Sequence, residues 1–386
     1  MKHRAWAEIN LDAAAENMRN IRAVTNPSAQ IMAVVKADAY GHGFLEMSKV
    51  FLENGADRLA VATIDEAVQL RGEGINVPIM ILGASENEDA ANLVKYDIIP
   101  AVYDFEFAKV ISDVAKAVNK TAKIHIKLDT GMSRIGFVAS EGNEKIVDEI
   151  IELSKLPNIE VEGIFSHFST SDEKGHDYTN MQFNRFMQVV EQLEKKGLKI
   201  PIKHICNSAG IMMYPEMHLD MVRPGIILYG LYPSNEVDKT KLKLKKVMTL
   251  KARITMVKEV EPGRGVSYGK EYITEDNTKI ATISIGYADG YIRKYANNGV
   301  VLLSDGTTAP IIGRICMDQC MIDVTNVHNI YKGDEVILFG DSTVTADDIA
   351  KKLDTINYEV VCMVSKRIPR VYIKNGRTVK TLNYLV

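Results

Sequence analysis

The residue best suited to chemistry is Lys36, because it leaves a hydrophobic strand and meets a glycine-rich segment. The run 31–35 is apolar and contains two valines, so it has the length of a buried strand and is too short for a helix. Gly41 and Gly43 then interrupt the chain before 44–54, where the spacing predicts a helix. Desolvation at the end of a strand favours the neutral form of a lysine amine, which is a nucleophile towards carbonyl compounds. An isolated lysine at such a position more often only extends towards water.

Polar side chains also follow four later apolar runs, at the positions where a parallel barrel places its functional groups. They are Lys127, Asp129 and Arg134 from the end of 122–127 onwards, Ser166 and His167 after 160–164, Asn207 and Ser208 after 202–206, and Arg223 and Gly225 after 219–222. Together they are the groups that a phosphorylated pyridine such as pyridoxal phosphate (PLP) needs, and barrel phosphate sites are commonly built after strands seven and eight. Taken alone, Ser208 could be a helix N-cap and His167 an ordinary loop histidine, whereas a buried Arg223 requires a partner.

The elements that would position these residues alternate between strands and helices. Strand-like runs occur at 31–35, 58–62, 78–82, 98–102, 122–127, 160–164, 202–206 and 219–222, and helical spacing occurs at 11–24, 64–71, 104–118 and 178–196. Strands that alternate with helices predict right-handed parallel crossovers. Eight strands within roughly 200 residues predict a closed (β/α)₈ barrel, and a miscounted strand would restore the alternative of an open, doubly wound sheet.

The pattern changes after about residue 240, where strands and turns dominate. Strand texture is found at 248–260, 279–286, 300–303, 309–324, 335–339 and 370–386, and one helix is expected at 345–353 with Thr345 as its N-cap. We therefore predict a barrel domain over 1–240 and a β-rich domain over 241–386. The strand expected at 5–10 could pack with the second domain.

Composition narrows the classes of partner. The chain has 386 residues, with 47 Lys and Arg against 50 Asp and Glu and a net charge of -3, which argues against nucleic acid or an anionic membrane as the main partner. We find no uncharged stretch long enough to cross a bilayer and no apolar signal region near the N-terminus. The four cysteines, at 206, 316, 320 and 362, form no CxxC pair, so we expect no metal site or disulfide framework and a cytoplasmic location.

The run from Val34 to Gly43, VVKADAYGHG, closely resembles the PLP-lysine motif of the alanine racemases. Three later segments are similar to other motifs of that family: 265–269 (GVSYG), 285–290 (IGYADG) and 313–318 (GRICMD). The resemblance extends over nearly the whole chain. It implies a (β/α)₈ barrel followed by a mostly β domain, with PLP as the cofactor.

The resemblance also implies roles for individual residues. The lysine that matches Lys36 holds PLP, and the tyrosine that matches Tyr268 is the second catalytic base. The implied cofactor contacts are Tyr40, Ser208, Gly225 and Tyr358 at the phosphate, His167 against the ring and Arg223 at the pyridine nitrogen, to which we add Asn207 beside Ser208. The implied substrate contacts are Arg134, Tyr287 and the main-chain amide of Met317, and Lys127 matches a lysine that is carbamylated in some members.

The activity implied is a PLP-dependent interconversion of L- and D-alanine by two bases, which supplies D-alanine for peptidoglycan. Members of the family are head-to-tail homodimers with shared active sites. A related barrel decarboxylase of basic amino acids is one alternative, but it predicts an acidic group where Arg223 stands. A guanidinium keeps its proton and leaves the pyridine nitrogen neutral, which favours racemisation. A non-catalytic PLP-binding barrel is the other alternative, and such proteins lack the β domain. Discrimination between alanine and serine stays open.

Overall fold

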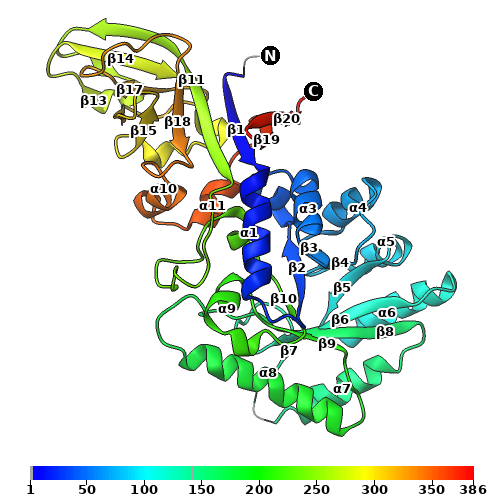
Figure 1. Cartoon of the computed structure of the whole chain (residues 1–386). Coiled ribbons are helices and arrows are strands. Elements are labelled where there is room, and N and C mark those ends of the chain that lie inside the picture. The colour runs from blue at the N-terminus through cyan, green and yellow to red at the C-terminus, as the bar shows by residue number, and fades with distance from the viewer. Residues whose placement is uncertain (1–2, 141) are drawn as a thin grey trace. The chain divides into compact units, whose positions relative to one another are not determined.

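The computed structural model describes residues 3–140 and 142–386 (Figure 1). The barrel domain predicted from residue 1 therefore begins with two residues that lie outside the described part of the chain. The described residues form two compact units. The first, which we call the β unit, contains the chain up to residue 14 together with 40–43 and 246–386. The second, the barrel unit, contains 15–39 and 44–245.

The barrel unit is built on eight parallel strands in the order β10-β2-β3-β4-β5-β6-β8-β9, and the short β7 pairs with β6. Their bounds are β2 Gln30–Val34, β3 Arg58–Val61, β4 Ile79–Ile81, β5 Ile98–Val102, β6 Ala122–Asp129, β7 Phe137–Val138, β8 Ile159–Phe165, β9 Ile202–His204 and β10 Met221–Val222. The two end strands approach each other, because Asp220 N–H donates to Lys203 O at 3.1 Å and Arg223 N–H donates to Cys206 O at 3.0 Å. Each of the eight predicted strands is present, and the predicted barrel is confirmed.

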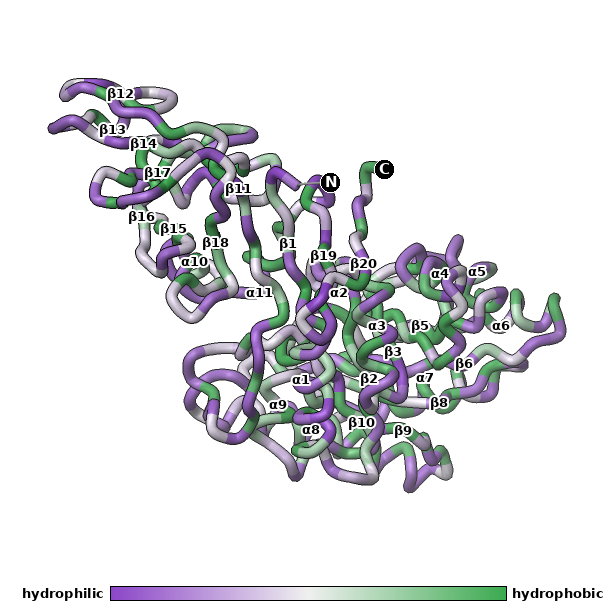
Figure 2. Tube along the Cα trace, turned by 45° about the horizontal axis from the view of Figure 1, so that its top comes forward, coloured by the Kyte–Doolittle hydropathy of each residue, from purple (hydrophilic) through white to green (hydrophobic). Residues whose placement is uncertain are grey.

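Helices follow most of the barrel strands, and hydrophobic and hydrophilic residues alternate along the barrel unit (Figure 2). The helices are α1 Leu11–Val24, α3 Phe44–Glu53, α4 Ile64–Gly72, α5 Ala90–Lys95, α6 Phe105–Ala117, α7 Glu144–Ser154, α8 Asp177–Lys195 and α9 Ser208–Met213, with 3-10 turns η1 Asn87–Asp89, η2 Pro215–Met217 and η3 Ile226–Tyr229. In α6, the Asp104 side chain caps the helix by accepting from Phe107 N–H at 2.7 Å. Phe107, Ala108, Ile111 and Ala115 form its buried face.

The β unit contains a nine-stranded sheet in the order β14-β17-β16-β15-β18-β11-β1-β19-β20. The bounds are β1 Ala5–Asn10, β11 Met248–Val260, β14 Thr278–Ile283, β15 Val300–Leu303, β16 Thr308–Ile312, β17 Cys320–Asp323, β18 Glu335–Phe339, β19 Arg370–Lys374 and β20 Arg377–Leu382, with a separate hairpin of β12 Gly265–Val266 and β13 Tyr272–Ile273. The N-terminal β1 is antiparallel to β11 and parallel to β19. The mostly β fold predicted for the C-terminal part is confirmed.

Short helices complete the β unit: η4 Tyr268–Lys270, η5 Tyr287–Asp289, η6 Arg293–Tyr295, α10 Ala346–Leu353 and α11 Asn357–Cys362. The predicted N-cap of α10 is confirmed, since the Thr345 hydroxyl accepts from Asp348 N–H at 3.0 Å and the Asp348 carboxylate accepts from Thr345 N–H at 3.1 Å. This reciprocal pair is a capping box. The helix α11 was not predicted.

The segment after Lys36 differs from the expected glycine-rich loop. Residues 37–40 all have positive φ, between 52° and 55°, and Gly41 follows with φ 79°, so α2 Lys36–Gly41 is a left-handed helical turn. Such a conformation is strained for residues with a side chain. Hydrogen bonds hold it: Ala37 N–H donates to Glu66 Oε1 at 2.6 Å, and Phe44 N–H donates to Asp38 Oδ1 at 2.9 Å.

Candidate active site

Five of the predicted site residues line one cavity of about 280 Å³ in the barrel unit. They are Lys36, Lys127, Arg134, His167 and Arg223, and the apolar part of the lining includes Leu82, Ile135 and Phe165. They come from the segments that follow β2, β8 and β10, from β6 and from the loop after it. The chain therefore gathers at one cavity the side chains that it places near the ends of four different strands.

Lys127 departs in one detail from the expectation, because β6 continues to Asp129 and Lys127 lies inside the strand. Its side chain is buried, and its Nζ lies 4.7 Å from the centre of the Phe165 ring. Burial, together with the positive charges of Arg223 and Arg134, holds the pKa of Lys127 well below its ordinary value. The amine is therefore suited to act as a neutral group.

Arg223 is buried at the cavity and has the partners that a buried guanidinium requires. Its Nη1 donates to His204 Nδ1 at 2.6 Å, and its Nη2 donates to the carbonyls of Ser166 at 2.7 Å and Ile205 at 3.1 Å. His167 Nδ1 lies 3.3 Å from the same Nη2. Within residues 3–140 and 142–386, no partner is described for Nε, so this N–H is available to a ligand of the cavity.

The charges at the cavity have clear electrostatic consequences. Burial lowers the pKa of Arg223 to about 10, so the guanidinium remains a cation near neutral pH. Burial and the charge of Arg223 hold the pKa of His167 well below its ordinary value. His167 is therefore neutral, as a ring that lies against a ligand in a cationic cavity should be.

The loops after β9 and β10 are joined by a side chain predicted to bind phosphate. Ser208 Oγ accepts from Gly225 N–H at 2.9 Å. The interpretation of Ser208 as a helix N-cap is wrong, because Asn207 caps α9 by accepting from Gly210 N–H at 2.9 Å. Asn207 also accepts from Ser171 Oγ at 2.9 Å, so the backbone of this loop is fixed.

The β unit brings together the other two residues predicted to contact phosphate. The rings of Tyr40 and Tyr358 have centroids 6.1 Å apart, and Tyr40 is buried. Burial, with a smaller effect of Cys362, raises the pKa of Tyr40, so its hydroxyl stays protonated and can donate a hydrogen bond. Arg370, which the sequence analysis missed, is fully buried in the same unit and donates from Nε to Gly41 O at 2.9 Å.

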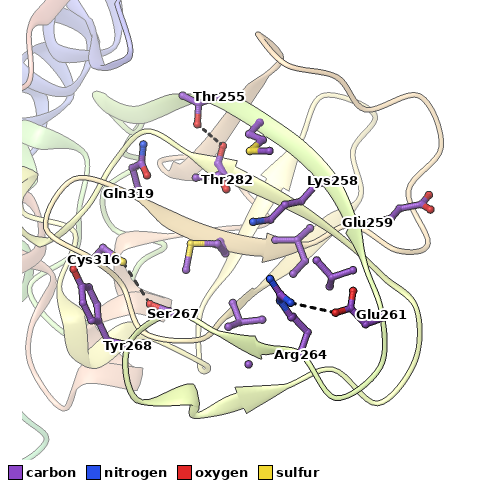
Figure 3. A pocket seen from close by; sticks show the side chains of 16 residues that line it. Thr255, Lys258, Glu259, Glu261, Arg264, Ser267, Tyr268, Thr282, Cys316 and Gln319 are labelled. Atoms are coloured by element: carbon purple, nitrogen blue, oxygen red, sulfur yellow. Dashed lines mark hydrogen bonds and ion pairs between the residues drawn. The ribbon is translucent and has the colours of Figure 1, made fainter.

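The predicted second base, Tyr268, lies at the surface of the β unit with 68% of its area exposed. It lines an open groove of about 850 Å³ beside β11 (Figure 3). Next to it, Ser267 Oγ donates to Arg314 O at 2.7 Å and lies 3.4 Å from Cys316 Sγ. These contacts fix the backbone that carries Tyr268.

Tyr287 and Met317, predicted to contact the substrate, lie on two segments of the β unit that are hydrogen-bonded to each other. Tyr287 N–H donates to Cys316 O, and Ala288 N–H donates to Met317 O, both at 3.0 Å. The approach is close enough that a Cβ on Gly286 would lie 2.4 Å from Met317 O. In the described part of the chain the Met317 amide has no partner, which leaves it available to an anion.

The sequence analysis missed a set of buried polar residues inside the barrel: His125, His204, Glu162 and Arg58. The only available signal was their alternation with apolar residues in strands that otherwise read as core. Among the residues that the structure describes, no group of three or more His, Cys, Asp or Glu could hold a metal ion. Within the same residues, no helix has the length and apolar character needed to cross a membrane.

Comparison with known proteins agrees with this fold and these motifs. Residues 9–233 match the family described as alanine racemase, N-terminal domain, and residues 247–372 match alanine racemase, C-terminal domain. The chain is 52% identical over 383 residues to the alanine racemase of Clostridium tetani, covering 98% of each protein. It is similar over 100% of both chains to the structure of the Clostridium difficile 630 alanine racemase, with a TM-score of 0.97 and 46% identity. For the Bacillus anthracis alanine racemase with bound L-Ala-P, the TM-score is 0.93 and the identity 35%, over 100% of this chain and 99% of that one.

The barrel and the β domain both match alanine racemase family models, so the class of the protein is an amino-acid racemase, an isomerase. The chain belongs to the alanine racemase family.

Proposed function

We propose that this protein interconverts L- and D-alanine with PLP bound through Lys36, and that the product D-alanine serves peptidoglycan synthesis in the cytoplasm. The observation that carries the proposal is the cavity that joins Lys36 with the buried Arg223 and the neutral His167. The relatives named above support alanine as the substrate.

The residues present fit PLP. Arg223 offers a fixed positive charge and an Nε–H for which the described residues supply no partner, Tyr40 offers a protonated hydroxyl, and Ser208 and Gly225 offer an ordered loop. When bound, PLP supplies a conjugated ring that delocalises the charge left behind when the α-proton is removed. Because the Arg223 guanidinium donates a hydrogen bond without losing its proton, a ring nitrogen that faces it stays unprotonated.

Two bases are required because racemisation removes a proton from one face of the α-carbon and returns one to the other. Lys36 would act on one face and the Tyr268 hydroxyl on the opposite face. Arg134 and the Met317 amide would bind the substrate carboxylate, and Tyr287 would limit the size of the side chain admitted. Asn207 would hold the phosphate loop through its cap on α9.

Lys127 would be carbamylated. A neutral lysine amine adds to carbon dioxide, forming an N–C bond and releasing one proton, so the product carries one negative charge. The lowered pKa of Lys127 supplies the neutral amine, and Arg134 and Arg223 are the cations that would stabilise the carbamate.

We further propose a head-to-tail homodimer in which the β unit of one chain closes the barrel of the other. The support is that the described residues of the β unit expose ten large apolar side chains, among them Met256, Tyr268, Ile273, Tyr287 and Met317. Met256 and Tyr268 line the same open groove beside β11, and a contiguous apolar surface is typical of one that a partner covers. A two-fold dimer would exclude water from both sites with one self-complementary interface.

The deciding experiment is chiral chromatography after incubation of PLP-loaded protein with a panel of L-amino acids, with Lys36→Ala as the control. We expect D-alanine from the wild type and none from the variant. D-Serine at a comparable rate would widen the substrate assignment, and release of carbon dioxide without racemisation would support a decarboxylase instead. Borohydride reduction and peptide mapping should place the pyridoxyl group on Lys36, and a label on another lysine would refute the cofactor assignment.

A further inference from the structure

A continuous chain of buried polar side chains runs inside the barrel from Arg223 to Glu162. Arg223 Nη1 lies 2.6 Å from His204 Nδ1, His204 Nε2 lies 2.9 Å from His125 Nδ1, and His125 Nε2 lies 3.1 Å from Glu162 Oε2. Both histidines are fully buried, and Arg223 and Glu162 are 3% and 6% exposed. Barrel interiors are ordinarily filled by branched apolar residues, so this chain requires an explanation.

The two ends of the chain fix the direction of each hydrogen bond. Arg223 can only donate, so His204 Nδ1 must be an acceptor and the His204 proton must reside on Nε2. That proton is donated to His125 Nδ1, which places the His125 proton on Nε2 as well. Glu162, as a carboxylate, accepts it. Both histidines are therefore neutral Nε2–H tautomers, and all the hydrogen bonds point from Arg223 to Glu162.

The surrounding strands leave space for this chain of hydrogen-bonded side chains. His125 lies opposite Gly163 in the β6–β8 pairing, and a Cβ on Gly163 would lie 2.5 Å from two atoms of the His125 ring. His204 stacks on Phe165, with ring centroids 4.8 Å apart and an interplanar angle of 3°. Gly163 leaves room for the His125 imidazole, and the Phe165 ring packs flat on that of His204. Both rings are therefore fixed in place.

At the far end of the hydrogen-bond chain, the Glu162 carboxylate is paired with two cations. Glu162 accepts from Arg58 Nη1 at 2.6 Å and from Lys123 Nζ at 2.9 Å. Burial favours protonation of Glu162, but the hydrogen bonds from His125, Arg58 and Lys123 overcome this and lower its pKa, so it stays a carboxylate. Burial likewise lowers the pKa of His125 and His204, which keeps both rings neutral.

We propose that Glu162 and His125 are positioning residues for the reaction: acting through His204, they hold the Arg223 guanidinium in the orientation that leaves Nε–H for the ligand. A carboxylate at one end polarises the hydrogen bonds of the chain and makes His204 Nδ1 a stronger acceptor. Both N–H groups of Nη2 and one N–H of Nη1 are engaged, so in the described part of the chain Arg223 keeps its Nε–H and the second Nη1 N–H as donors. Its consequence for catalysis rests on the proposed function, but the hydrogen-bond chain itself does not.

The first measurement is the protonation pattern of the histidines in the wild-type holoenzyme, by ¹⁵N NMR with selectively labelled histidine at about pH 7.5. We expect His125 and His204 to be neutral, each with its proton on Nε2. A proton on Nδ1 of either ring, or a doubly protonated ring, would overturn the proposal. This measurement stays decisive even if the protein proves not to racemise alanine.

The second measurement compares two variants. His125→Phe keeps the ring volume but removes both of its hydrogen bonds, whereas Lys123→Met removes one partner of Glu162 and leaves the chain intact. We expect His125→Phe to lower kcat for racemisation about tenfold or more, to change KM less than about threefold and to accelerate Arg223 Nε–H exchange. Lys123→Met should stay within about twofold of wild type in all three.

Racemisation by His125→Phe within twofold of wild type, with an unchanged Arg223 exchange rate, would refute the positioning role. If His125→Phe does not fold, Glu162→Gln serves instead. Its amide oxygen can still accept from His125, but the charge that polarises the chain is lost, so Arg223 Nε–H exchange should rise at least about threefold. An unchanged rate in that variant would refute the proposal equally.

Discussion

The left-handed turn after Lys36 is a place where we expect a substitution by glycine to stabilise the protein, which is the opposite of its usual effect in a helix. Ala37 has φ 52° and an exposed side chain, so replacing it by glycine removes a strained conformation without opening a cavity. A residue with a side chain loses about 1–2 kcal/mol of stability in the left-handed conformation, and glycine does not. Glycine also makes the unfolded chain more flexible, which lowers the free energy of unfolding by roughly 0.5–1 kcal/mol. We therefore expect Ala37→Gly to raise the free energy of unfolding by about 0.5–1 kcal/mol.

The matched control is Ala91→Gly, because Ala91 is also exposed and lies in α5, a helix of ordinary hand. The same change there should lower the free energy of unfolding by about 1 kcal/mol. The two variants should thus differ by roughly 1.5–2 kcal/mol, with opposite signs relative to wild type. The hydrogen bond from Ala37 N–H to Glu66 is retained in glycine and does not enter the difference.

The assay is thermal unfolding of all three proteins at one protein concentration and one PLP concentration, because bound ligand and association both shift the midpoint. We expect the order Ala37→Gly, wild type, Ala91→Gly from highest to lowest midpoint. If Ala37→Gly is destabilised as much as Ala91→Gly, the turn is not strained in solution and the reasoning fails.

Three further predictions concern the barrel interior and the assembly. Gly163→Ala places a Cβ 2.5 Å from the His125 ring, so urea unfolding should show a loss of about 1–3 kcal/mol, and an unchanged midpoint would mean that the ring is not held there. His204 has a pKa well below its ordinary value because of burial and the Arg223 charge, so the unfolded chain binds a proton below about pH 6.5 that the folded protein does not. The free energy of unfolding should therefore fall by about 1.4 kcal/mol between about pH 7.5 and 5.5 because of His204 alone. In His204→Phe the fall over this pH range should be smaller by that amount, and an identical pH dependence in the two proteins would contradict the prediction. Finally, mixing inactive Lys36→Ala and Tyr268→Ala chains should restore about a quarter of all sites after random exchange of subunits, whereas no recovery after confirmed exchange would exclude a shared site.

The sequence carried a large part of the fold because local signals agreed with one another. The apolar runs that alternate with helical spacing gave each of the eight barrel strands, and the ends of α1 and β11 coincide with their predicted bounds. A parallel strand that is buried on both faces has a continuous apolar sequence, which makes it easy to recognise. The cap of α10 could be predicted because Thr345 contacts a residue only three positions away. The family membership expected from the four motifs is confirmed by the comparisons.

Other features were decided by contacts between residues far apart in the chain. The left-handed turn at 37–41 could not be predicted, because local preference disfavours it and Glu66 and Arg370 stabilise it from elsewhere. The same holds for Asn207, rather than Ser208, as the cap of α9, since the Ser208 hydroxyl is occupied by the Gly225 amide.

The buried chain from Arg223 to Glu162 is the clearest case. A lone histidine in an apolar strand gives no indication of its partner, and His125 and His204 are 79 positions apart. Only the closure of the barrel brings their rings together and removes the water that would otherwise satisfy them. The sequence determined which strands form and which residues end them, while the tertiary structure determined the hydrogen bonds between their side chains, because those bonds depend on distances that no local pattern encodes.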